Sequence, residues 1–200
     1  MGTRNLTCVF KDGEYKVAQY GQWDGYPAGV GLEILTFLHE WANELAYELV
    51  NVDWITEEER EATWEGYGRS EDGYVEMHQY ELWSEEYPEL SRDTGGKILA
   101  RIREFSPSER KPKLKLENSL SFAADSLFCE WAYVVDYDKG TFEVYEGFNK
   151  EPLTPMERFF EFDNPKEEYR PVKLKKAYPL NALPSVEKFL EDCEPVYEEE

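Results

Sequence analysis

One segment of this chain is predicted to be a helix that is buried over more than half of its surface. Between residues 32 and 49, apolar side chains recur at alternating spacings of three and four, which is the period of an α-helix. The stripe consists of Leu35, Leu38, Ala42, Leu45 and Leu49, and it is widened by Ile34, Phe37 and Trp41. So wide an apolar face has to pack against a second layer.

Strands are predicted at both ends of the chain. Residues 3–10 and 15–20 alternate between apolar and polar side chains and flank Asp12-Gly13, which indicates a β-hairpin. A second, longer hairpin is predicted where residues 126–137 and 141–148 flank a turn at Asp138-Lys139-Gly140. Residues 172–178 resemble an edge strand whose lysines discourage further pairing.

The remaining elements are short. A capping box, Thr56 to Glu59, indicates a helix start, and further helices are predicted over about 74–86 and 94–104, after Thr154-Pro155, and over about 184–192. Residues 106–118 are predicted to be a basic loop. The whole chain, 1–200, is therefore predicted to be one α+β domain: an antiparallel sheet of about five strands, made of two hairpins and an edge strand, with packed helices. The acidic tail, 192–200, is expected to fray.

Three cysteines, Cys8, Cys129 and Cys193, bear on the compartment. Their odd number and unpaired spacing indicate reduced thiols rather than a disulfide scaffold. No apolar run approaches the roughly 18 residues of a membrane span, and the first residues lack a signal-peptide core. We therefore expect a cytoplasmic protein without membrane contact. No Cys or His cluster has zinc spacing, so no metal ligand is predicted, and the sequence identifies neither a cofactor nor a catalytic residue.

The formal net charge of −21 is unevenly distributed. Residues 56–93 hold 13 Asp or Glu against 3 Arg, whereas residues 97–115 hold 7 Lys or Arg against 2 Glu. Direct binding to DNA or RNA requires a net basic surface, so this composition disfavours it. An acidic face has two interpretations: it keeps the chain in solution, or it binds a basic protein partner.

A glycine-rich loop, residues 22–31, separates the first hairpin from the buried helix. Its candidate ligand-binding residues are Gln22, Trp23, Asp24, Tyr26, Gly29 and Gly31. Glycines before a helix can present backbone N–H groups to an anion, but the Lys-Ser/Thr pair of a phosphate loop is missing and Asp24 would repel phosphate. The structural alternative is that the glycines permit turns, the aromatic rings pack and Asp24 caps its own turn.

Four segments carry a resemblance to known proteins: MGTR at 1–4, QWDGYPAGVG at 22–31, SRDTGGKIL at 91–99 and DSLFCEWAYVVD at 125–136. Together they resemble a family of proteins from phages, bacteria and fungi that has no established activity. The resemblance extends over most of the chain and implies a common fold, but it carries over no catalytic residue. Relatives in such families often have His where this chain has Gln22.

Three functions remain open at this point. The first is a ligand-binding domain, in which a small molecule stacks on Trp23 or Tyr26 and hydrogen-bonds to Gln22 and Asp24. The second is an acidic interaction or inhibitor protein, of a phage-type anti-defence or nucleic-acid-mimicking kind, that binds a basic host protein. The third is a hydrolase that uses Asp24 together with a metal or a second carboxylate.

Overall fold

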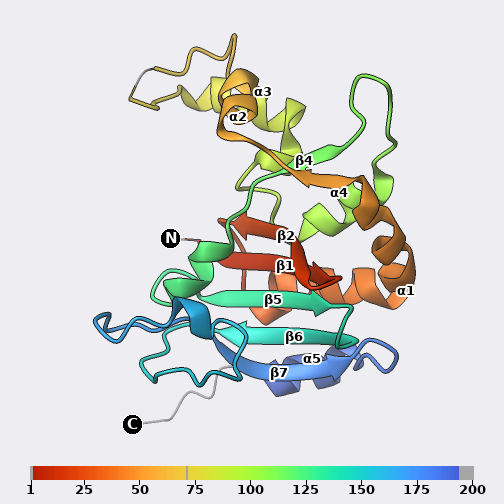
Figure 1. Cartoon of the computed structure of the whole chain (residues 1–200), viewed down its shortest axis with the longest axis vertical. Coiled ribbons are helices and arrows are strands. Elements are labelled where there is room, and N and C mark those ends of the chain that lie inside the picture. The colour runs from red at the N-terminus through yellow and green to blue at the C-terminus, as the bar shows by residue number, and fades with distance from the viewer. Residues whose placement is uncertain (1, 71, 194–200) are drawn as a thin grey trace.

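The structure is a computed structural model that describes residues 2–70 and 72–193. Its helices and strands are β1 (Asn5–Lys11), β2 (Glu14–Gly21), α1 (Leu32–Glu48), β3 (Val52–Trp54), α2 (Glu57–Thr63), α3 (Met77–Glu86), α4 (Ile98–Glu104), β4 (Leu114–Leu116), β5 (Trp131–Asp136), β6 (Thr141–Glu146), β7 (Lys173–Pro179) and α5 (Val186–Cys193). The predicted α+β architecture, with its two hairpins, edge strand and buried helix, is confirmed (Figure 1).

The main sheet has five strands in the order β2-β1-β5-β6-β7. Three of its four pairings are antiparallel, as predicted. The fourth, between β1 and β5, is parallel and joins the two hairpins edge to edge. A second parallel pair, β3 with β4, lies outside this sheet. The sequence did not indicate either parallel pairing, and β4 falls in the stretch predicted to be loop.

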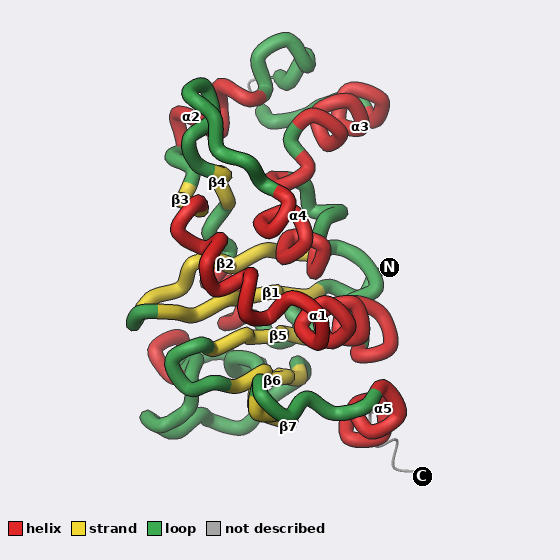
Figure 2. Tube along the Cα trace, turned by 90° about the vertical axis from the view of Figure 1, so that its right-hand side faces the viewer, coloured by secondary structure: helices red, strands yellow, loops and turns green. Residues whose placement is uncertain are grey.

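Both faces of the main sheet are covered. On one face, α1, α4 and α5 pack against alternate strand residues such as Val9, Val135 and Phe142, and Figure 2 shows α1 and α5 on the same side. On the other face, segments 120–129 and 153–172 cover Leu6, Val134 and their neighbours. All six residues of β5 are consequently buried, which explains why the strand is apolar from Trp131 to Val135 instead of alternating.

The phase of the long helix agrees with the sequence. Ile34, Leu35, Leu38 and Leu45 are buried in α1, whereas Glu40 and Glu44 are exposed. Beyond edge strand β2, α2 and α3 form a lobe, residues 57–86, at the end of the molecule shown uppermost in Figure 1. This helical lobe begins with the predicted capping box, in which Thr56 and Glu59 bond to each other's backbone N–H groups.

Two local predictions differ from the structure. The helix predicted over 74–86 begins only at Met77. The helix predicted after Thr154-Pro155 does not form. Thr154 donates to the Glu157 carboxylate, as at a helix start, but the chain then continues as turns. Side chains at Leu153, Arg158 and Phe159 are held against the sheet, and these tertiary contacts override the local helix signal. Of the predicted fraying tail, residues 194–200 lie outside the described part of the chain.

Candidate functional site

The glycine-rich loop is fastened to the end of the sheet by its backbone. The Gly25 N–H donates to the Thr3 carbonyl at 2.9 Å, and the Gln22 N–H donates to the Arg92 carbonyl at 2.9 Å. From β5, the buried Tyr133 hydroxyl donates to the Gly25 carbonyl at 2.7 Å. These bonds reach the loop from three directions and fix where its side chains point.

The four segments that carry the resemblance meet at this place. The bonds just described join the N-terminal, loop, 91–99 and 125–136 segments around Gly25 and Gln22. A further bond, from the Arg4 N–H to the Glu130 carboxylate at 3.2 Å, ties the first segment to the last. Segments that are distant in the sequence therefore build one end of the molecule.

Backbone bonds inside the loop decide whether it can hold an anion. The Gly29 and Gly31 N–H groups donate to the Tyr26 carbonyl at 2.9 and 3.4 Å, and the Val30 N–H donates to the Asp24 carbonyl at 2.8 Å. The N–H groups that precede α1 are therefore occupied within the loop, and the arrangement does not support an anion cradle. Asp24 closes this turn with φ of 52°, a conformation that Asp tolerates better than most residues.

A cavity of about 290 Å³ lies between the loop and the segment that leads into α4. Its walls combine polar groups, backbone and one indole from two separate stretches of the chain. They consist of Gly21, Gln22, Trp23, Asp24, Gly29, Val30, Glu33, Arg92, Asp93, Thr94, Gly95 and Lys97. We call it the loop cavity.

Four of the six predicted ligand-binding residues line the loop cavity: Gln22, Trp23, Asp24 and Gly29. The Trp23 side chain is 49% exposed, and its indole N–H donates to the Asp93 carboxylate at 2.7 Å. The Gln22 amide oxygen accepts from the Tyr20 hydroxyl at 2.6 Å, which directs the amide N–H groups away from Tyr20.

The other two predicted residues lie elsewhere. Gly31 is buried beneath the loop, and a Cβ atom there would lie 3.0 Å from the Tyr133 hydroxyl, so the glycine allows close packing on the core. Tyr26 is exposed and does not line the cavity; its hydroxyl lies 3.4 Å from an Asp24 carboxylate oxygen. Both residues therefore act on the site through the loop's shape.

Charges of both signs surround the loop cavity. Asp24, Glu33 and Asp93 contribute carboxylates, and Arg92 and Lys97 contribute cations. Burial raises the pKa of Glu33, and the nearby Lys97 charge only partly offsets this effect. Burial therefore disfavours the charged form of the Glu33 carboxylate.

The sequence analysis did not identify the wall that faces the loop. Arg92, Asp93 and Lys97 occur in a stretch interpreted only as a helix start. The available signal was that this stretch, 91–99, is one of the four segments that carry the resemblance.

The three cysteines all lie in the buried part of the fold. Cys8, Cys129 and Cys193 are free and buried, and burial raises the pKa of Cys129 well above its ordinary value. In the described ranges, no three histidine, cysteine or carboxylate side chains are grouped as a metal ion would require. None of the helices there has the length and apolar character needed to cross a membrane.

Comparisons with protein-family models, with curated proteins and with solved structures found no match for this chain.

Proposed function

We propose that the protein is a small-molecule-binding domain whose ligand occupies the loop cavity. The observation that carries the proposal is the convergence of two hydrogen-bonded segments on one cavity, which Gln22, Trp23 and Asp24 line together with Arg92 and Lys97. A few polar groups around a concave site with an aromatic wall are typical of ligand pockets. The mixed charges favour a polar molecule that carries both an amine or hydroxyl donor and an acceptor.

The location and evolutionary context belong to the same proposal. Three buried free thiols support a cytoplasmic protein. Membership of the phage, bacterial and fungal family that the sequence resembles stays a prediction that rests on the four sequence segments. A hydrolase acting through Asp24 would need a proton donor, and Glu33 in the same cavity is the residue to test for that role.

Asp24→Asn should weaken ligand binding at least tenfold and leave the thermal midpoint nearly unchanged. Asn tolerates the same left-handed backbone conformation and has almost the same shape, so the substitution removes only the charge. Affinities of both proteins for a panel of amino acids, amino sugars and other polar metabolites, measured by ligand-observed NMR and calorimetry, test the prediction.

Asp12→Asn is the matched control, because Asp12 also has a positive φ, of 56°, and lies in the distant β1–β2 turn. It should bind every compound as the wild type does. If no compound distinguishes Asp24→Asn from Asp12→Asn, the loop cavity is not the binding site.

A second candidate function is supported by the outer surface of α3. Glu76, Glu81 and Glu85 are exposed, and none of the described basic side chains forms an ion pair with them. Met77 and Leu82 lie on the same helix and are 66% and 52% exposed. An acidic surface interspersed with apolar side chains suits a basic protein partner, as the sequence analysis anticipated.

Replacing Glu76, Glu81 and Glu85 with lysine should abolish that association, and high salt should weaken it steeply in the wild type. The control replaces the exposed Glu40, Glu161 and Glu167 with lysine, which changes net charge equally. Pull-downs at low and high salt compare how much basic partner protein the wild type, the α3 variant and the control variant each retain. Retention by the α3 variant, or loss in the control variant, would rule out α3 as the docking surface.

A further inference from the structure

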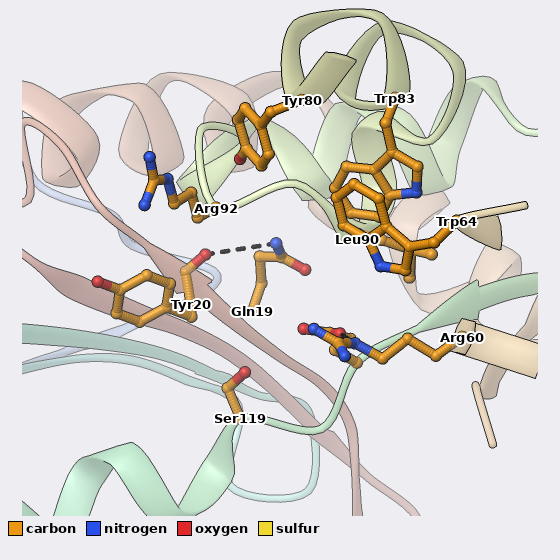
Figure 3. A pocket seen from close by; sticks show the side chains of 10 residues that line it. Gln19, Tyr20, Arg60, Trp64, Tyr80, Trp83, Leu90, Arg92 and Ser119 are labelled. Atoms are coloured by element: carbon orange, nitrogen blue, oxygen red, sulfur yellow. Dashed lines mark hydrogen bonds and ion pairs between the residues drawn. The ribbon is translucent and has the colours of Figure 1, made fainter. Parts of the chain in front are cut away.

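A second cavity, which shares only Arg92 with the loop cavity, lies between edge strand β2 and the helical lobe (Figure 3). It has a volume of about 150 Å³, and its walls are largely aromatic. They consist of Gln19, Tyr20, Arg60, Trp64, Tyr80, Trp83, Leu90, Arg92, Glu117 and Ser119. We call it the aromatic cavity. A cavity of about this volume is known to accept a single benzene-sized ring.

Gln19 places an unpaired acceptor in the wall of this cavity. Its side chain is only 4% exposed, and its amide nitrogen donates to the carbonyls of Tyr20, at 3.3 Å, and Ser91, at 3.1 Å. Because carbonyls only accept, these two bonds fix which end of the amide is nitrogen. The amide oxygen is buried without a hydrogen-bond partner. Figure 3 shows it on the side of the amide that faces Trp64 and Arg60, away from Tyr20.

Trp64 supplies an unpaired donor. Its ring stacks on Trp83 with centroids 3.9 Å apart and planes inclined by 11°. The Trp83 indole N–H donates to the Thr63 hydroxyl at 3.0 Å, whereas the buried indole N–H of Trp64 has no partner. Buried polar groups are seldom left unpaired, because an unpaired group loses its hydrogen bonds to water without replacement. An acceptor and a donor in the wall of one cavity therefore indicate that something else bonds to them.

Arg92 adds a positive charge at the wall. Its guanidinium lies over the Tyr80 ring, 5.0 Å from the centroid, and within the described ranges no carboxylate pairs with it. Arg60, by contrast, pairs with Glu117. Among the described ionised groups of the wall, Arg92 is therefore the one without a partner of opposite charge. Its positive charge suits an anionic substituent on the ligand.

We propose that the aromatic cavity binds a planar six-membered heterocycle with a ring N–H and a ring carbonyl, the chemistry of a pyrimidine base. The ring N–H donates to the Gln19 amide oxygen, and the ring carbonyl accepts from the Trp64 indole N–H. The ring packs among the aromatic side chains, and a carboxylate or phosphate substituent contacts Arg92. A purine such as adenine has no ring carbonyl and does not match this pattern of a ring N–H beside a carbonyl.

The test is titration of the full chain with uracil, orotate and uridine monophosphate, by calorimetry and by ¹⁵N-resolved NMR of the indole N–H signals. Saturable binding of uracil should shift the Trp64 indole signal downfield and leave the bonded Trp83 indole signal nearly in place. This readout needs no variant. Adenine should not bind. Absence of uracil binding, or binding that leaves the Trp64 signal unmoved, overturns the proposal.

Trp64→Phe deletes the unpaired N–H together with one ring of the indole, so part of the stack on Trp83 is lost as well. We expect it to bind uracil about tenfold more weakly, because the donor is gone, and to have a somewhat lower thermal midpoint, because stacked area is lost. Arg92→Gln should weaken orotate binding more than uracil binding, and whether uridine monophosphate or orotate binds tighter distinguishes a phosphate from a carboxylate substituent. Equal affinity of wild type and Trp64→Phe for uracil overturns the assignment.

The two proposals fail separately. Asp24 does not line the aromatic cavity, and Trp64 does not line the loop cavity. Asp24→Asn should therefore retain uracil binding, and Trp64→Phe should retain whatever occupies the loop cavity. A compound lost only in Asp24→Asn, with no response to uracil in either protein, would support the proposed function and overturn the inference.

Discussion

Arg158→Met should destabilise the protein by about 3–5 kcal/mol, because the substitution strands two buried carboxylates. The Arg158 side chain is 6% exposed; it pairs with Glu143 at 2.7 Å and also with Asp136, whose side chains are 5% and 1% exposed. The Tyr145 hydroxyl completes the group by donating to Glu143 at 2.6 Å. Urea unfolding of wild type and variant measures the difference.

Lys150→Met is the control, since it removes a cation from an ion pair in the same part of the chain. The Lys150 and Glu168 side chains of that pair are 57% and 72% exposed, so water already screens their attraction. This variant should have nearly the wild-type midpoint. Adding Glu143→Gln to Arg158→Met should recover part of the lost stability, because it removes one stranded charge. A loss below about 1 kcal/mol for Arg158→Met would contradict a buried ionic group here.

The stability lost in Arg158→Met should also depend on pH. Burial acts to raise the pKa of Glu143, but the hydrogen bonds from Arg158 and Tyr145 outweigh it and hold that pKa below its ordinary value. Because the folded pKa lies below the unfolded value of about 4.3, Glu143 stabilises the fold above that pH, and this contribution disappears as pH falls. Without Arg158 the buried carboxylate gains nothing from ionisation. The gap between wild type and Arg158→Met should therefore narrow on acidification below pH ~4.

Leu45→Ala should lower the free energy of unfolding by about 2–5 kcal/mol, through lost burial and the cavity left behind. Leu45 is completely buried in α1 and belongs to the core that joins α1 to the main sheet. That loss is a large share of the roughly 5–15 kcal/mol that stabilises a domain. A lower urea midpoint and a lower yield of folded protein are the measurements.

Glu44→Ala, at the next position, is the matched control for Leu45→Ala. Glu44 is exposed and lies 3.7 Å from Arg103 in a solvent-screened pair. We expect its removal to change stability by no more than about 0.5 kcal/mol. If Glu44→Ala proved the more damaging of the two, the buried face of α1 would be assigned to the wrong side.

Local signals predicted most of the elements. Asp12-Gly13, Lys139-Gly140 and the Thr56–Glu59 capping box each specify a turn or a helix start from a few neighbouring residues, and all three form as predicted. The parallel pairing of β1 with β5 has no such signal, because its partners are 126 positions apart, as in Asn5 opposite Trp131. The helix predicted after Thr154 does not form for a similar reason, since distant contacts made by Arg158 outweigh the local helix start.

The residues of the two cavities likewise divide into those that the sequence predicted and those that it did not. Gln22, Trp23, Asp24 and Gly29 were predictable because they follow one another in a loop of unusual composition. The aromatic cavity was not, since its walls come from β2, α2, α3 and the segment after β4. One signal was present: Trp64, Tyr80 and Trp83 are concentrated in a stretch for which the sequence predicted short helices and negative charge but no site.

The position of β5 in the chain also affects how the protein folds while it is being synthesised. The β1–β2 hairpin leaves the ribosome before β5, yet one edge of β1 pairs only with β5, about 120 residues later. At 5–20 residues per second the hairpin waits for roughly 6–24 s with that edge unpaired. Apolar residues of β1, such as Leu6 and Val9, border this edge, and an exposed apolar strand edge favours pairing with other chains. We therefore expect nascent-chain crowding and binding of chaperones, rather than the stability of the finished fold, to limit the yield of this protein in rapid overexpression.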